Sequence, residues 1–177
     1  MQLETKRLII RDLQENDAKD FVKQGNDKEI NYFNWYIPYP LTLAKAKNII
    51  KKRNAEFVGH RWLYELAIIL KETKEFLGII SIYDVSKPEN KAKIGYWIGE
   101  EYRGNGYSEE ALKEIILFSF KELNLNKLSA KTMTDNKVSN NLLEKSGFRK
   151  IGIKKWDKII EGKKHDVFEW ELLNPYQ

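Results

Sequence analysis

The residues of this sequence best suited to chemistry form a glycine turn between an apolar segment and an amphipathic one. The turn reads Arg103-Gly104-Asn105-Gly106-Tyr107-Ser108 and follows the apolar residues 94–98. A strand, a glycine turn and a helix in this order direct backbone N–H groups and the positive end of a helix dipole at one point. Glycine matters there because a side chain would hold an anion away from the amides. We therefore expect this turn to bind the pyrophosphate of a phosphorylated cofactor.

A tight connection between a strand and a helix would also explain the two glycines. Two other phosphate-binding patterns are absent from the sequence. It contains neither G-x-x-x-x-G-K-[ST] nor an early G-x-G-x-x-G followed by an acidic residue after a second strand. Taken alone, the residues leave both the anion site and the plain turn open.

The amino-acid composition excludes several kinds of catalytic site. The chain has no cysteine and only two histidines, His60 and His165. Disulfides, thiolate metal sites and an acyl-cysteine intermediate are therefore excluded, and we expect no metal. No G-x-S-x-G nucleophile motif is present. If the protein transfers a group, we expect direct transfer between two bound substrates.

The length and charge of the chain fit one domain covering residues 1–177. The formal net charge is +5, but the lysines are dispersed among acidic residues, so we do not expect a nucleic-acid partner. No apolar run approaches the roughly 18–20 residues that span a bilayer, and residues 1–7 lack the apolar core of a signal peptide. We therefore expect a cytoplasmic protein without membrane association.

The periodicity of apolar residues predicts the elements that position the glycine turn. The helix after the turn has one apolar stripe, formed by Leu112, Ile115, Ile116, Ser119 and Leu123. Three further helices are expected at residues 17–24, 42–57 and 138–145. Seven strands are expected, at residues 8–13, 63–70, 77–83, a strand ending at 98, and 127–133, 149–156 and 167–172. This order implies an α/β or α+β fold, a mixed sheet with helices on both faces.

Two motifs in the correct order resemble the GNAT superfamily of acyl-CoA-dependent N-acetyltransferases. The turn at 103–108 resembles the cofactor signature Q/R-x-x-G-x-G/A, with Ser108 at the final position. The second motif reads Asn136-Lys137-Val138-Ser139-Asn140-Asn141-Leu142-Leu143-Glu144-Lys145-Ser146-Gly147-Phe148. The likeness extends from Leu3 to Leu172 and is greatest to the RimJ/RimL branch, which acetylates the N-termini of ribosomal proteins.

The resemblance implies a mostly antiparallel seven-stranded sheet and direct transfer of an acetyl group from acetyl-CoA to a primary amine. It also implies which residues bind acetyl-CoA. The amides of residues 103–108 would hold the pyrophosphate, and Trp97, Ile98 and Gly99 would pair with the pantetheine arm through their backbone. Asn136 would hydrogen-bond the pantetheine or nearby backbone.

The resemblance implies a catalytic role for Ser139, as the donor of a proton or hydrogen bond to the departing CoA sulfur. Many superfamily members have a tyrosine acid where this chain has Leu143. Asn136 and Ser139 also suit helix capping, so the sequence does not separate capping from catalysis.

The general base is not assigned from the sequence. Some relatives have a glutamate where this chain has Lys93. Glu65, Asp84 and His60 lie near the expected cleft, and we interpret each as a surface or structural residue.

The acceptor of the acetyl group stays open. The aromatic residues 32–40 resemble the substrate-side loop of the branch, where Trp35, Tyr36 and Tyr39 would line an acceptor channel; a hydrophobic lid over the core is the alternative. A ribosomal-protein N-terminus, another peptide N-terminus, a polyamine and an aminoglycoside all fit. The resemblance also implies a homodimer.

Two other classes of function remain open. One is a catalytically degenerate protein that binds acetyl-CoA as a sensor. The other is a basic RNA-binding or ribosome-binding module.

Overall fold

The computed structural model describes residues 1–34, 37–55 and 62–176, with residues 54 and 55 described by backbone alone. Trp35, Tyr36 and His60 therefore lie outside the described residues. The strands are β1 (Gln2–Glu4), β2 (Leu8–Asp12), β3 (Tyr64–Leu70), β4 (Phe76–Ser86), β5 (Lys91–Ile98), β6 (Lys127–Met133), β7 (Arg149–Ile160) and β8 (Lys163–Leu173). The helices are α1 (Ala18–Gly25), α2 (Lys28–Phe33), α3 (Leu43–Ala55), α4 (Tyr107–Lys121) and α5 (Lys137–Lys145), with short 3-10 helices at Glu15–Asp17 and Glu100–Tyr102.

All eight strands belong to one sheet, in the order β1-β2-β3-β4-β5-β6-β8-β7. Every neighbouring pair is antiparallel except β5 and β6, which are parallel. The predicted mixed and mostly antiparallel sheet is confirmed, with eight strands where seven were expected. The additional strand is β1, whose three residues pair with β2. Three residues are too few to show a period-two pattern, so the sequence did not reveal it.

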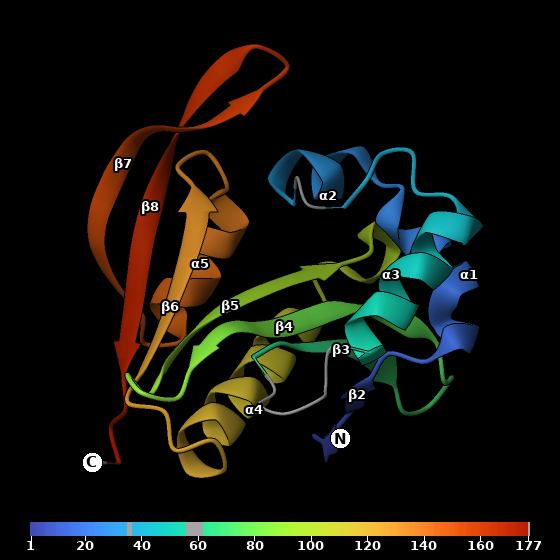
Figure 1. The fold of residues 1–177 in the computed structure, drawn as a ribbon, viewed down its shortest axis with the longest axis horizontal. Coiled ribbons are helices and arrows are strands. Elements are labelled where there is room, and N and C mark those ends of the chain that lie inside the picture. Colours follow the sequence, from blue (N-terminus) through green and yellow to red (C-terminus); the bar gives the residue numbers. More distant parts are fainter. Residues whose placement is uncertain (35–36, 56–61, 177) are drawn as a thin grey trace.

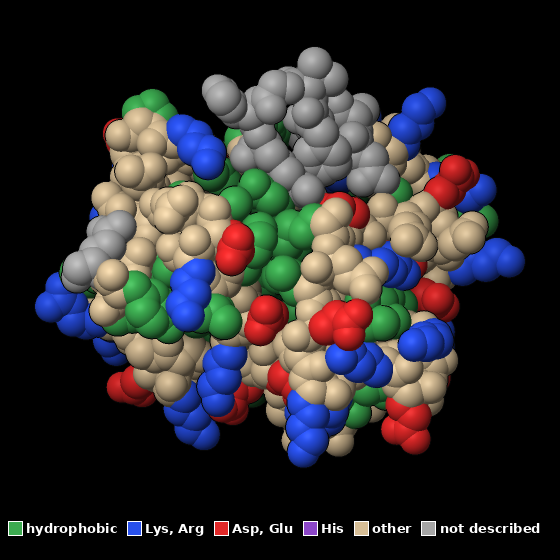
Figure 2. Space-filling view, turned by 90° about the horizontal axis from the view of Figure 1, so that it is seen from below, with side chains coloured by type: hydrophobic (Ala, Val, Ile, Leu, Met, Phe, Trp, Pro, Cys, Tyr) green, Lys and Arg blue, Asp and Glu red, His purple; other side chains and the backbone are tan. Residues whose placement is uncertain are grey.

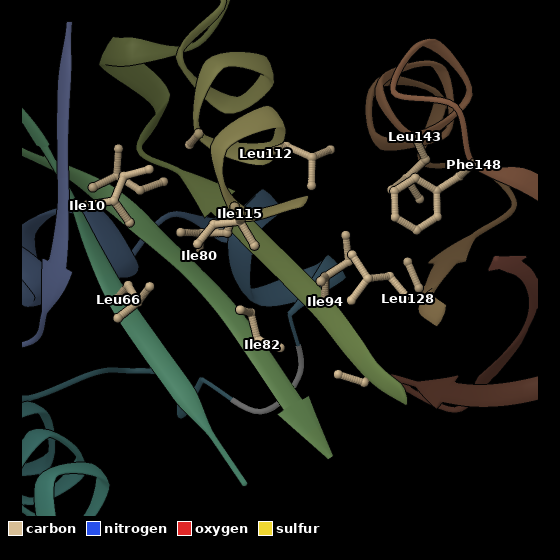
Figure 3. Packing of buried hydrophobic residues seen from close by; sticks show 14 of the residues in the cluster. Ile10, Leu66, Ile80, Ile82, Ile94, Leu112, Ile115, Leu128, Leu143 and Phe148 are labelled. Carbon is tan, nitrogen blue, oxygen red and sulfur yellow. The ribbon is translucent and has the colours of Figure 1, made fainter. Parts of the chain in front are cut away.

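Helices cover both faces of the sheet, as predicted (Figure 1). Side chains alternate between the two faces along each strand. On β3, Leu66 and Ile68 belong to the cluster that packs against α4, whereas Ala67 and Ile69 belong to the cluster beneath α1 and α3. Figure 3 shows the first cluster, in which Leu112 and Ile115 of α4 pack onto the strands.

The two halves of the sheet separate at the β5–β6 pair. Only Lys91, Ala92 and Lys93 of β5 pair with β6, and the two strands diverge beyond that point (Figure 1). α4 follows β5, and α5 follows β6, so the N-termini of both helices are near the open end of the gap.

The charged side chains are interspersed over the face shown in Figure 2. Lysine and arginine lie among aspartate and glutamate there and form no continuous basic patch. None of the helices in the described part of the chain is long and apolar enough to cross a membrane.

Candidate active site

The glycine turn adopts a backbone that only glycine accepts readily. Gly104 and Gly106 both have φ of +77°, in the left-handed region. Gly106 is the N-cap of α4, whose first N–H groups have no partner within the helix. A Cβ placed on Gly104 would have no heavy atom within 4 Å, so the turn is open on that side. The arrangement suits an anion at the helix N-terminus.

A residue that the sequence interpretation missed, Arg7, holds this turn in place. Its Nη1 donates to the carbonyl oxygen of Asn105 at 2.9 Å, and its Nε donates to Oε2 of Glu110 at 2.7 Å. Its guanidinium carbon lies 4.5 Å from the ring centre of Tyr107. Burial raises the pKa of Glu110, but hydrogen bonds from Thr5 and Arg7 outweigh it, so the pKa lies below its usual value. No local pattern marks this contact, because its partners are about a hundred residues apart.

The side chain of Arg103 is directed to α2. Its Nη1 donates to Oε2 of Glu29 at 2.6 Å, its Nη2 lies 3.1 Å from Oδ2 of Asp27, and its Nε donates to the carbonyl of Ile98 at 3.2 Å. Arg103 therefore joins the end of β5 to the N-terminus of α2, and only its backbone belongs to the glycine turn.

Of the three residues expected to pair with the pantetheine arm, only Ile98 directs its backbone away from β4. The N–H of Gly99 donates to Leu77 of β4 at 2.8 Å. The N–H of Gly99 and the C=O of Ile98 belong to the same peptide unit and point in opposite directions, so the Ile98 carbonyl points away from β4. The direction of the backbone groups alternates along a strand, so those of Tyr96 also point away from β4. Trp97 directs its backbone toward β4. The structure thus places Ile98 at the gap, and Trp97 and Gly99 on the paired side.

Packing explains why Trp97 and Gly99 occupy those positions. The Trp97 side chain is buried, with its ring centre 5.8 Å from that of Phe21. A Cβ on Gly99 would lie 2.0 Å from Oε1 of Gln24, so glycine there allows α1 to approach the sheet. Both residues have a structural role in this arrangement.

The gap between β5 and β6 is bounded by two hydroxyl-bearing residues, Ser139 and Tyr96. Asn136 caps α5, because its Oδ1 accepts a hydrogen bond from the Ser139 N–H at 3.1 Å. The Ser139 side chain is therefore not the cap. The Tyr96 hydroxyl donates to the Ser139 carbonyl at 3.5 Å, and burial raises the pKa of Tyr96 to about 12. Leu143 is fully buried beside Phe148 in the core (Figure 3).

A cavity of about 450 Å³ extends from this gap to the α2 and α3 side of the sheet. Its lining comes from α2, α3, strands β3 to β6, α5 and the β7–β8 hairpin. Ser81 of β4 and Gly95 of β5 are small residues in this lining, and Glu65 of β3 lies beside Ser81 in the sheet register.

Glu65 and Asp84 are the two carboxylates in the described lining, and they differ in burial. The Glu65 side chain is 6% exposed and lies 2.7 Å from Nε of Arg53. The Asp84 side chain is 53% exposed and bonds Lys93 at 2.8 Å. Glu65 is thus buried and lines the cavity, so of the two expected alternatives, surface or structural, its burial excludes the surface one.

The aromatic segment is only partly described. Tyr39 is 56% exposed and does not line the cavity, whereas Phe33 and Asn34 do. The Tyr32 hydroxyl lies 3.3 Å from Oδ2 of Asp135 and 3.3 Å from Nδ1 of His165, which joins α2 to the C-terminal hairpin. Across the described ranges, no group of three or more metal-binding side chains is found.

Comparison with known proteins identifies a common family. Residues 7–149 match the family described as Acetyltransferase (GNAT) domain. The chain is 30% identical over 177 residues to the uncharacterized N-acetyltransferase YoaA of Bacillus subtilis (strain 168), which covers 98% of this chain and 97% of that protein. It is 27% identical over 129 residues to the ribosomal-protein-serine acetyltransferase of Escherichia coli (strain K12), covering 73% of this chain and 72% of that one.

A solved structure shares the fold. The spermidine N-acetyltransferase from Vibrio cholerae, in complex with CoA and spermine, has a TM-score of 0.84 and 19% identity, and covers 96% of this chain and 97% of that one. At this identity the likeness concerns the fold alone. The predicted resemblance to the RimJ/RimL branch is confirmed by the ribosomal-protein acetyltransferase among the relatives.

Proposed function

Because the chain belongs to the GNAT acetyltransferase family and is an acetyl-CoA-dependent N-acetyltransferase, we propose that its acceptor is the α-amine of a peptide or protein N-terminus. The acetyl group passes directly between the two substrates in a ternary complex. The observation that carries this proposal is the cavity, which joins the β5–β6 gap to the α2 and α3 side of the sheet. Such a channel admits two substrates from opposite sides.

The residues around the gap fit acetyl-CoA, which supplies the acetyl group as a thioester. The open turn at Gly104 and Gly106, with the N-terminus of α4, would hold the pyrophosphate. The gap-facing backbone of Tyr96 and Ile98 would bind the pantetheine arm and polarise the acetyl carbonyl. Arg7 adds a positive charge beside the turn.

Ser139 would donate to the sulfur at the gap, and Tyr96 would do so on releasing its 3.5 Å hydrogen bond to the Ser139 carbonyl. Ser139 and Tyr96 both line the cavity there. With a pKa of about 12, the Tyr96 hydroxyl keeps its proton at neutral pH and remains a donor. Holding both substrates in one channel contributes on the order of 7–11 kcal/mol to lowering the barrier.

The charges of the cavity favour an acceptor with a single ammonium group. Among the lining residues that the structure describes, two are carboxylates, Glu65 and Asp84, whereas Arg53, Lys93, Lys131 and Lys158 are cations. A polyamine carries several positive charges and would face this excess of cations. An α-amine has a pKa near ~8, so about a tenth of it is already neutral at pH 7. The ribosomal-protein-serine acetyltransferase among the relatives supports the same acceptor class.

The test is CoA release from acetyl-CoA with a panel of amines. We expect turnover with short peptides that begin with free Ser, Ala or Met, none with the same peptides blocked at the N-terminus, and little with spermidine. A preference for spermidine would contradict the proposed acceptor class. Binding of acetyl-CoA without turnover on any amine would indicate a sensor.

A further inference from the structure

Glu65 is a buried carboxylate near the start of β3. Its neighbours Leu66, Ala67 and Ile68 are fully buried, and its own side chain is 6% exposed. A charged group in such a position costs several kcal/mol of stability unless it is paired. Arg53 provides that pairing at 2.7 Å, yet Glu65 also forms part of the cavity wall. A buried charge that lines a cavity is a candidate for a functional role.

The sheet register aligns Glu65 with two small residues that also line the cavity, Ser81 and Gly95. Glu65 pairs with Ser81 of β4, and Ser81 pairs with Gly95 of β5. Neighbouring strands lie about 4.8 Å apart, so Glu65 and Gly95 are separated by roughly 10 Å at the backbone. Ser81 and Gly95 carry little or no side chain on this face, so the row leaves room above it. Gly95 belongs to β5, the strand that borders the gap.

We propose that Glu65 binds the ammonium group of the acceptor and takes up its proton. This inference rests on the proposed function and adds the residue that selects the amine. An amine above Ser81 and Gly95 lies between the Glu65 carboxylate and the gap, within reach of the carboxylate directly or across one water. A carboxylate has about four lone-pair sites on two oxygens, so the contact with Arg53 does not exhaust its capacity to accept hydrogen bonds.

The step balances in atoms and charge. The ammonium gives one proton to Glu65 and becomes a neutral amine. The amine nitrogen forms a bond to the acetyl carbonyl carbon as the carbon–sulfur bond breaks. The sulfur leaves as a thiol, with the second proton of the amine, and Glu65 returns its proton to water. The products are the acetylated amine, CoA and one proton.

The experiment compares Glu65→Gln with a matched control, Asp17→Asn. Asp17 is also buried and paired with an arginine: its side chain is 7% exposed, and its oxygens lie 2.8 Å from Nη1 and Nη2 of Arg11. Both variants remove the charge of a buried carboxylate that contacts an arginine, so both are expected to unfold at a lower temperature. Neither is expected to change the Kd for acetyl-CoA. Only E65Q is expected to lower kcat/KM for a free-amine peptide, by tenfold or more at pH 7.

The pH dependence separates the proposed role from a structural one. At pH 9.5 most of the acceptor amine is already neutral, so the deficit of E65Q is expected to shrink toward the level of the control. A variant that folds poorly would show the same deficit at both values of pH. If E65Q does not fold, Glu65→Asp keeps the charge with a shorter reach, and the same trend with pH is expected.

A binding measurement tests the proposal without turnover. With CoA bound, the wild type is expected to bind a free-amine peptide and not its N-acetylated form, by calorimetry, whereas E65Q loses this discrimination. Wild-type kcat/KM in E65Q at pH 7 would overturn the role of Glu65 and leave the proposed function intact. A wild-type protein that binds CoA and no amine would overturn the proposed function itself.

Discussion

The backbone N–H and the Nε of Arg7 bind the two carboxylate oxygens of Glu110, each at 2.7 Å. This double contact connects the loop between β1 and β2 with the first turn of α4. A third hydrogen bond, from Nη1 of Arg7 to the Asn105 carbonyl, reaches the glycine turn itself. The turn is therefore held from two sides, by its own glycine backbone and by a residue from the start of the chain.

Replacing Arg7 by methionine should weaken the binding of acetyl-CoA. Hydrogen bonds from a charged group contribute about 1.5–3 kcal/mol, so we expect the Kd to rise about tenfold or more. Isothermal titration calorimetry at two salt concentrations measures this change. Arg149→Met, which removes an exposed ion pair with Glu171, is the control and should bind like the wild type. An unchanged Kd in R7M would show that Arg7 is dispensable for the cofactor site.

Gly106→Ala should combine a loss of stability with a loss of cofactor affinity. Alanine at a φ of +77° costs about 1–2 kcal/mol. Gly162, in the β7–β8 turn, has the same φ, and a Cβ there would meet no heavy atom within 4 Å, whereas one on Gly106 would meet Nη2 of Arg7 at 3.5 Å, an ordinary contact; Gly162→Ala should therefore cost a similar amount. Urea denaturation compares the stabilities, and calorimetry compares the affinities for acetyl-CoA. Equal affinities in the two variants would argue against an anion site at residues 103–108.

Ser139→Ala should lower kcat with little effect on folding. Proton transfer by a positioned side chain contributes about 100-fold or more, so we expect a decrease of at least tenfold in kcat. Acetyl-CoA affinity and Tm should stay unchanged, because Asn136 supplies the cap of α5. Asn136→Ala, by contrast, should lose about 1 kcal/mol of stability. Full turnover in S139A would remove Ser139 from the mechanism and leave Tyr96 as the hydroxyl at the gap.

Tyr96 should make the protein less stable at high pH. Burial raises its pKa from 10.0 to about 12 in the folded state, so between these values the unfolded chain releases a proton that the folded chain keeps. The unfolded state then binds fewer protons, and the free energy of unfolding falls as pH rises from 10 to 12, by about 2–3 kcal/mol. In Tyr96→Phe this decline should be smaller, as measured by denaturation at pH 8, 10 and 11. Parallel curves for the two proteins would show that Tyr96 ionises normally.

Local signals in the sequence predicted most of the elements and the glycine turn at residues 103–108. The glycine turn was evident because a strand, two glycines and an amphipathic helix are consecutive in the chain. The antiparallel pair β3 and β4 was evident for the same reason. The second motif indicated Asn136 and Ser139 as candidate caps of α5, and in the structure Asn136 is the cap.

Features that depend on distant contacts were not predictable in this way. The hydrogen-bond register with β4 decides which residues of β5 direct their backbone groups into the gap. The sequence does not reveal this register, so Trp97, Ile98 and Gly99 were all expected to pair with the pantetheine arm. The contact of Arg7 with Glu110 crosses 103 positions. Glu65 resembles any polar residue at the start of a strand until the cavity around it is known.

The three residue pairs between β5 and β6 join two parts of the chain to which we assign different roles. Glu65, Ser81 and Gly95 all precede β6, whereas Ser139 and the cap of α5 follow it. On the proposed roles, the residues that would choose the acceptor lie in the first part of the chain, and Ser139 at the leaving group lies in the second. A chimera joined within residues 99–106 would exchange acceptor range while keeping α5 intact.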